Sequence, residues 1–146
     1  MALLYPPALG TILLCDYSIG GAGPPEMVKR RPAVVVSPRL RHRGGLCSLV
    51  PLSTTAPRTA VDYVVPLTLE VAPPTPFDAR NVWAKCDMLS CASFARLDLF
   101  RCARSSSGKR RYLKLRVDEQ QMSNIRIGIL AGLGISRSLE DQSAIS

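Results

Sequence analysis

Apolar residues in the first two-thirds of the chain fall in short runs, separated by glycine, proline and small polar residues. Such runs between turn-forming residues predict β-strands. Residues 33–37 (AVVVS) form a mostly β-branched run, typical of a strand buried on both faces. Pro51 and Pro66 interrupt two other runs, and because proline lacks a backbone donor, each should lie at an edge or a bulge. The strands predicted here are residues 11–17, 33–37, 46–52 and 61–69.

The pattern changes toward the C-terminal end. One or two short strands are expected within residues 81–96, and residues 111–117 (RYLKLRV) alternate basic and apolar positions as a strand does. Asp118 is then a suitable N-cap for a helix. Gly134 is suited to end that helix, whereas Gly128 weakens its middle by about 1 kcal/mol. The apolar face expected for the helix consists of Met122, Ile125, Ile129 and Leu133.

Many short strands followed by one helix predict a mainly β fold, a small antiparallel barrel with the helix packed against it. The length of 146 residues suits one domain. We expect residues 1–136 to form that domain and residues 137–146 to be a polar tail.

The chain carries a net charge of +8, and arginine supplies 15 of its 19 basic residues. Basic residues are concentrated in residues 29–43 and 101–116, and no acidic residue interrupts either window. Guanidinium groups bind phosphate through two parallel hydrogen bonds and stack on bases. The two windows therefore favour a polyanionic partner, either a nucleic acid or an acidic protein tail. A solvated basic surface is the alternative for each window alone.

Cysteine spacing and hydropathy further limit which classes of protein the chain can belong to. The five cysteines include no pair with zinc-ligand spacing, so we expect reduced cysteines in the core and no metal or other cofactor. The N-terminal residues lack the basic start of a signal peptide, and no apolar run approaches the length of a membrane span. These features predict a cytoplasmic protein without a membrane partner.

Few residues remain for chemistry. His42 is the single histidine, and the sequence contains no phosphate-binding loop and no acidic cluster suited to two metals. Arg31 precedes a proline at the start of a buried strand, where it can clamp a phosphate, and Glu26 lies in the loop before it. Ser53 and Thr54 follow a neighbouring strand. Each is weak evidence alone, because paired arginines are commonly solvated and Ser-Thr runs commonly form turns.

Residues 26–38 (EMVKRRPAVVVSP), followed by residues 50–55 (VPLSTT), resemble the signature of the MazF/PemK toxins. The resemblance implies an SH3-like barrel of the CcdB, Kid and MazF type with a C-terminal helix, acting as a homodimer. It implies a sequence-specific, metal-independent endoribonuclease that cuts single-stranded RNA to 2′,3′-cyclic phosphate and 5′-hydroxyl ends. It also implies a cognate antitoxin with an acidic, disordered tail.

The resemblance assigns roles to individual residues. Arg31 matches the family's arginine, which is implied to stabilise the phosphorane and to do acid–base work, and Glu26 matches the loop glutamate. Because a guanidinium rarely gives up its proton, Glu26 is the chemically easier base if it reaches the 2′-hydroxyl. Either Ser53 or Thr54 matches the family's hydroxyl residue. For base stacking, the aromatic candidates are Tyr17 and Phe94. The residues expected to contact RNA are Lys29, Arg30, Arg39, Arg41, His42, Arg43, Lys85, Asp87, Arg110 and Arg111.

Two other functions remain open from the sequence. The first is a non-catalytic toxin of the same barrel superfamily that binds a protein, as the gyrase poisons do. The second is a nucleic-acid-binding barrel without catalysis.

Overall fold

A computed structural model of the 146-residue chain describes residues 3, 5–18, 23, 25, 27–102, 106–109 and 111–135. The expected polar tail, residues 137–146, lies outside the described residues, as do Glu26 and Arg110. The strands are β1 (Thr11–Asp16), β2 (Arg30–Val35), β3 (Leu46–Ser53), β4 (Val64–Thr68), β5 (Asn81–Lys85), β6 (Ser90–Ser93), β7 (Leu97–Asp98), β8 (Phe100–Cys102), β9 (Arg111–Leu113) and β10 (Leu115–Arg116). The helices are the 3-10 turns η1 (Cys86–Met88) and η2 (Phe94–Arg96) and the α-helix α1 (Glu119–Gly132).

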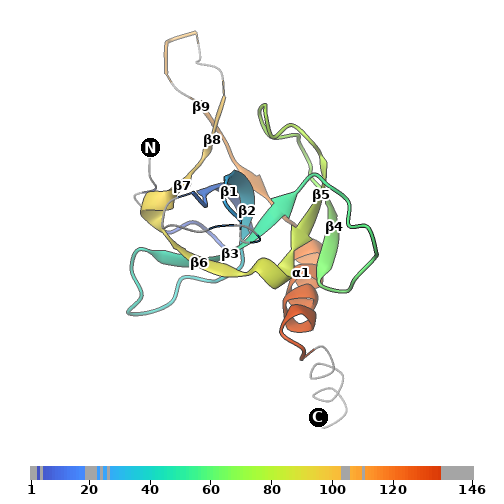
Figure 1. Cartoon of the computed structure of the whole chain (residues 1–146). Coiled ribbons are helices and arrows are strands. Elements are labelled where there is room, and N and C mark those ends of the chain that lie inside the picture. Colours follow the sequence, from blue (N-terminus) through green and yellow to red (C-terminus); the bar gives the residue numbers. More distant parts are fainter. Residues whose placement is uncertain are drawn as a thin grey trace.

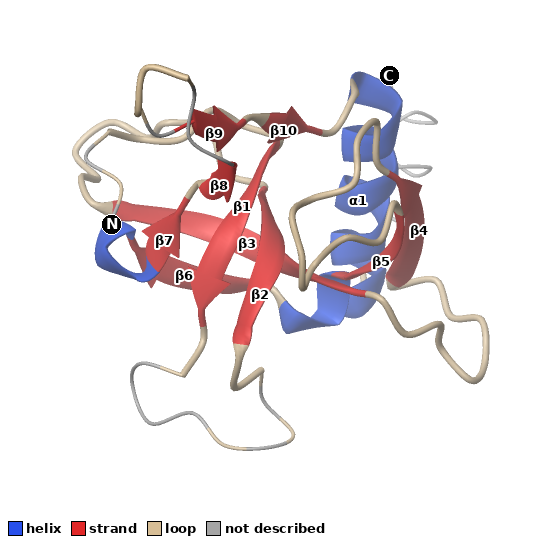
Figure 2. Cartoon of the chain, turned by 90° about the horizontal axis from the view of Figure 1, so that it is seen from above, coloured by secondary structure: helices blue, strands red, loops and turns tan. Residues whose placement is uncertain are grey.

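The strands form a strongly wrapped antiparallel sheet in the order β10-β1-β2-β3-β5-β4, with β6 added beside β3 and β7 beside β1 (Figure 2). Strand β3 joins the two halves, since it pairs with β2 and β6 along its first part and with β5 at its end. A separate hairpin of β8 and β9 projects from one side, and α1 lies beside β4 and β5 (Figure 1). The prediction of a mainly β fold with one terminal helix is confirmed.

The central strands are buried on both faces. Alternate residues of β1, β2 and β3 point to opposite sides, so Val34 contributes to one apolar cluster, whereas Ala33 and Val35 contribute to the other. The first cluster lies against α1 and contains Met122 and Ile125. This arrangement confirms the double burial expected from the β-branched run at residues 33–37. We call these sides the helix-side face and the opposite face.

The two interrupting prolines differ in their surroundings. Pro66 lies in β4, the last strand of the sheet order, as expected. Of the edge or bulge expected for Pro51, the edge is excluded, because Pro51 is buried within β3 and pairs with Ala33 of β2. On its other side, β3 pairs with β6 as far as Leu49 and with β5 from Leu52 onward, so the partner strand changes at Pro51. A residue without a backbone donor is tolerated at that change of partner.

Several predicted boundaries shift because pairing partners set them. Strand β2 begins at Arg30, three residues before the expected start, since Arg30 and Arg31 pair with β1. Strand β4 begins at Val64 rather than at residue 61. The single strand expected over residues 111–117 is two strands: β9 pairs with β8, and β10 pairs with β1.

Helix α1 begins as expected with the Asp118 side chain accepting from the Gln121 backbone at 2.7 Å. The helix ends at Gly132, and Gly134 follows the C-cap residue Leu133 with a φ of 78°, which suits glycine. Packing explains why a glycine is found at position 128 in the helix. A Cβ added there would lie 2.8 Å from Cys86 Sγ and from a Val65 methyl. Leu133, expected on the buried face, is 63% exposed, since it lies past the helix end. No helix in the described part of the chain has the length and apolar character that crossing a membrane requires.

All five cysteines are free. Cys15, Cys47 and Cys86 are buried core residues, whereas Cys91 is exposed on β6. Burial raises the pKa of the Cys86 thiol to about 12 and that of Cys47 to about 11. The expectation that the cysteines are core residues therefore holds for three of them and fails for Cys91.

Candidate functional site

Arg31 lies near the start of β2, opposite Cys15 of β1. Its side chain is half-buried, and its Nε atom is buried without a hydrogen-bond partner among the described residues. Leaving a charged donor buried and unpaired is costly, so such a donor is expected to find an anionic acceptor. Nε and one terminal nitrogen of a guanidinium together form the edge that binds two oxygens of a phosphate.

The register between β2 and β3 indicates which hydroxyl accompanies Arg31. Ala33 pairs with Pro51, and continuing this antiparallel register by two residues puts Arg31 opposite Ser53. Both then point to the same side of the sheet as Ala33 and Val35, which is the opposite face. One residue further out, Arg30 comes opposite Thr54 on the helix-side face.

The hydroxyl of Ser53 is held in place. Ser53 is 6% exposed, and its Oγ accepts a hydrogen bond from the Thr55 backbone N–H at 3.1 Å. Among the described residues, the acceptor for the Ser53 hydroxyl proton is the Thr55 carbonyl at 3.5 Å, a distance too long for a good hydrogen bond. A fixed hydroxyl with a poorly used proton is suited to donate to an oxyanion.

Thr54 is exposed and lines a cleft of about 220 Å³ on the helix-side face, together with Lys29, Arg30 and Phe77. Arg31 also borders this cleft, although strand alternation directs its side chain to the opposite face. Extended two and three residues beyond the observed pair of Ala33 with Pro51, the register thus assigns Arg31 to Ser53 and Arg30 to Thr54.

Lys85 and Asp87, at the end of β5 and in η1, lie in space near the turn that follows Ser53. They line a hollow of about 260 Å³ with Thr55 and Tyr63. Because Thr55 directly follows the Ser53–Thr54 pair, this hollow adjoins the end of β3. The structure therefore brings the expected residues Lys85 and Asp87 close to the Ser53 turn.

The other expected RNA contacts are dispersed. The exposed loop with Arg39, Arg41, His42 and Arg43 follows the far end of β2, so it lies away from Arg31 at the start of that strand. Arg111 is on the projecting hairpin. The described residues contain no group of three His, Cys, Asp or Glu side chains able to hold a metal ion.

Tyr17, one of the two aromatic residues expected to stack on bases, is covered in the structure. Tyr17 is 5% exposed, and burial raises its pKa, so it has no ring face open for stacking. The Arg96 guanidinium lies 6.0 Å from its ring centre. Phe94 is half-buried against the same apolar cluster. Asp16, opposite Arg30, has its pKa lowered by hydrogen bonds from Ser18 and by the charges of Arg30 and Arg96.

One wall of the cleft comes from residues that the sequence did not single out. Pro73, Pro76 and Phe77, in the connection between β4 and β5, close the cleft over Arg30. Phe77 is fixed by an edge-on contact with Phe100, with ring centres 6.4 Å apart. From sequence this segment reads only as a stiff connector, since nothing local shows where it folds back.

Comparison with known proteins gives the family. The sequence matches, over residues 9–130, the profile of the PemK-like, MazF-like toxins of type II toxin–antitoxin systems. The chain belongs to this family. A Haemophilus influenzae protein of uncharacterized function is 33% identical over 101 residues, which are 62% of this chain and 68% of that protein.

Solved structures agree on the fold. MazF from Deinococcus radiodurans matches with a TM-score of 0.58 at 21% identity, over 89% of this chain and 98% of that one. An endoribonuclease in complex with its cognate antitoxin, from a mycobacterial species, matches with a TM-score of 0.55 at 21% identity, over 89% and 97% of the two chains. These matches confirm the predicted MazF-like barrel with its C-terminal helix.

Proposed function

We propose that this MazF/PemK-family chain is a toxin endoribonuclease that cuts single-stranded RNA at short specific sequences without a metal ion. The observation that carries the proposal is the buried, unpartnered Nε of Arg31, on the side of the sheet to which the register assigns Ser53. Membership in the toxin family and the endoribonuclease neighbours support it.

The proposed reaction is an internal transesterification. The ribose 2′-oxygen attacks the adjacent phosphorus, and the bond from phosphorus to the 5′-oxygen breaks, which leaves a 2′,3′-cyclic phosphate and a 5′-hydroxyl. Arg31 binds two oxygens of the phosphorane through the edge that contains Nε. The Ser53 hydroxyl donates a hydrogen bond to a non-bridging oxygen. Glu26 takes the 2′-proton, and the departing 5′-oxygen receives a proton from water.

Residues around this pair are proposed to position the RNA. Lys29 and Arg30 lie at the start of β2 or just before it, where they meet the phosphates that flank the cut. Lys85 and Asp87, in the hollow beside the Ser53 turn, present a donor and an acceptor to base edges. The remaining basic residues contribute charge that attracts RNA at a distance.

The partners follow from the same proposal. The net charge of +8 is complementary to an acidic antitoxin tail, and a fold neighbour is an endoribonuclease bound to its cognate antitoxin. We also propose a homodimer, and a cytoplasmic location where the RNA substrate is found.

The test compares Arg31→Ala and Arg31→Lys with the wild type on a mixture of single-stranded RNAs in the presence of EDTA. Both variants are expected to lose cleavage, because lysine keeps the charge but lacks the two-pronged edge. Arg126→Ala is the matched control, since Arg126 is exposed on α1, away from the β2–β3 pair. Undiminished cutting by Arg31→Ala would refute the assignment. Binding of RNA without product by the wild type would instead indicate a non-catalytic barrel.

A further inference from the structure

Three hollows lie in series from the Arg30–Thr54 pair, the first two against the helix-side cluster and the third beside Leu3 and Thr11. The cleft at that pair shares Arg30, Pro76 and Phe77 with a hollow of about 380 Å³ that reaches Arg101. That hollow shares Asp98 and Leu99 with a third one of about 620 Å³. Each hollow thus shares lining residues with the next, and we call this series the path; it begins one residue from Arg31 and Ser53.

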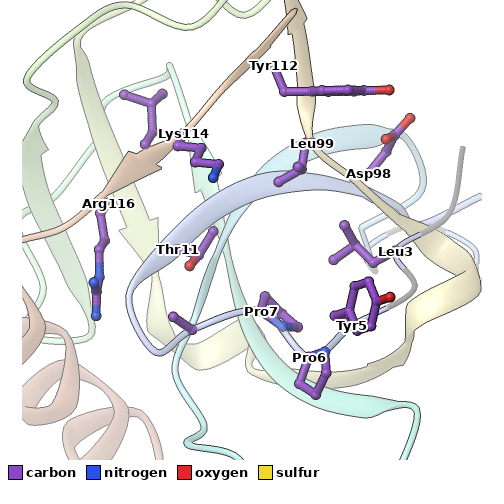
Figure 3. A pocket seen from close by; sticks show the side chains of 12 residues that line it. Leu3, Tyr5, Pro6, Pro7, Thr11, Asp98, Leu99, Tyr112, Lys114 and Arg116 are labelled. Carbon is purple, nitrogen blue, oxygen red and sulfur yellow. The ribbon is translucent and has the colours of Figure 1, made fainter.

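The far end of the path has the character of a stacking site. Tyr112 and Lys114 lie on one side of the third hollow, and Tyr5 and Pro6 on the other (Figure 3). Tyr5 is 79% exposed and Tyr112 is 37% exposed, so both rings have open surface. The N-terminal segment that carries Tyr5 is anchored by the Leu3 backbone N–H, which donates to the Leu97 carbonyl at 3.2 Å.

Cations recur along the whole path. Arg30 is at its start, Arg101 in the middle, and Lys114 and Arg116 at the far end. Asp98, the acidic residue on the described lining, is in an ion pair with Arg101 at 3.2 Å. Positive charges interspersed with aromatic rings along a groove match a single-stranded nucleic acid, with phosphates on the cations and bases on the rings.

We infer that the three hollows form one groove that holds the RNA chain as it leaves the cleavage site, with a distal base stacked on Tyr112 and Tyr5. The inference rests on the proposed function, because it takes the reacting phosphate to be at Arg31 and Ser53. Arg30 binds the phosphate at the point where the RNA chain passes from one face of the sheet to the other. Lys114 binds a phosphate at the distal end. The pair of tyrosines thereby extends the binding site well beyond the cleaved bond.

The experiment measures RNA affinity by fluorescence anisotropy for the full chain and its variants, with unstructured oligonucleotides of about four and about twelve nucleotides. DNA analogues of both lengths, which lack the 2′-hydroxyl, serve as uncleavable versions. Tyr5→Ala and Tyr112→Leu are expected to weaken binding of the long probe roughly tenfold each and to leave the short probe unaffected. Lys114→Gln should reduce the salt dependence of long-probe binding.

Matched controls are exposed residues of α1. Ile127→Ala controls for the loss of an exposed apolar side chain, and Arg126→Gln controls for the loss of one charge. Thermal melts confirm that each variant is folded.

The outcomes separate this inference from the proposed function. Long-probe affinity that is unchanged in both tyrosine variants overturns the groove, even if the wild type cleaves RNA. A length-dependent loss in these variants supports the groove, even if the wild type cleaves nothing. Wild-type protein that binds neither probe overturns both, and the groove would then suit an acidic peptide.

Discussion

Replacing in turn the two neighbouring hydroxyl residues at the end of β3, Ser53 and Thr54, should separate a catalytic role from a surface position. Ser53→Ala removes the acceptor of the Thr55 N–H and the proton proposed to reach the phosphorane. One lost hydrogen bond costs about 1 kcal/mol of stability, which lowers the melting temperature by about 4 °C. Losing one oxyanion donor reduces kcat about 100-fold.

The small loss of stability and the large loss of kcat expected for Ser53→Ala can be told apart. A domain with a stability of about 5 to 15 kcal/mol that loses about 1 kcal/mol stays almost fully folded, so unfolding cannot explain a 100-fold loss. Thr54→Val is the matched control, because Thr54 is exposed and its substitution should change stability by less than about 0.5 kcal/mol. Its kcat is expected to stay near the wild-type value.

The assay is cleavage of a fluorescent single-stranded RNA under single-turnover conditions, alongside thermal melts monitored by circular dichroism. A large loss of kcat in Thr54→Val together with normal cleavage by Ser53→Ala would refute the register argument. It would also move the site to the helix-side face.

Further predictions concern packing and the thiols. Gly128→Ala should destabilise the fold in urea titrations, because overpacking against Cys86 and Val65 costs about 1 to 3 kcal/mol, whereas the gain in helix propensity is about 1 kcal/mol; a more stable variant would contradict the contact. Iodoacetamide should label Cys91 in the native protein and leave Cys47 and Cys86 unmodified until unfolding, as peptide mass mapping would show. With a folded pKa raised from 9.0 to about 12, the Cys86 thiol stays neutral while its unfolded counterpart ionises, so the free energy of unfolding should fall as pH rises through this range. The fall should be shallower in Cys86→Ala, and equal slopes would oppose the buried assignment.

Local signals predicted most of the fold. The β-branched run at residues 33–37 indicated a strand buried on both faces, and Asp118 marked the start of α1. These signals act within a few residues of the chain. The surroundings of Pro51 could not be predicted, because they depend on where β6 ends and β5 begins beside β3.

The sequence was enough to name the residues of the candidate site, but not to say which face of the sheet each one lies on. Successive strand residues point to opposite sides, so the choice between Ser53 and Thr54 depends on a register that only the paired strands define. The pairing of Ala33 with Pro51 supplies it. The groove was beyond sequence reasoning, since Tyr5, Phe77 and Tyr112 come from three distant segments that only the fold brings to one path.

The most direct test of the central claim is to determine the ends of RNA fragments after incubation with the purified protein in EDTA. The account predicts cuts at a short recurring sequence, with 2′,3′-cyclic phosphate on one side and 5′-hydroxyl on the other, and none with Arg31→Ala. Intact RNA with the wild type, or fragments that carry 5′-phosphate ends, would contradict it.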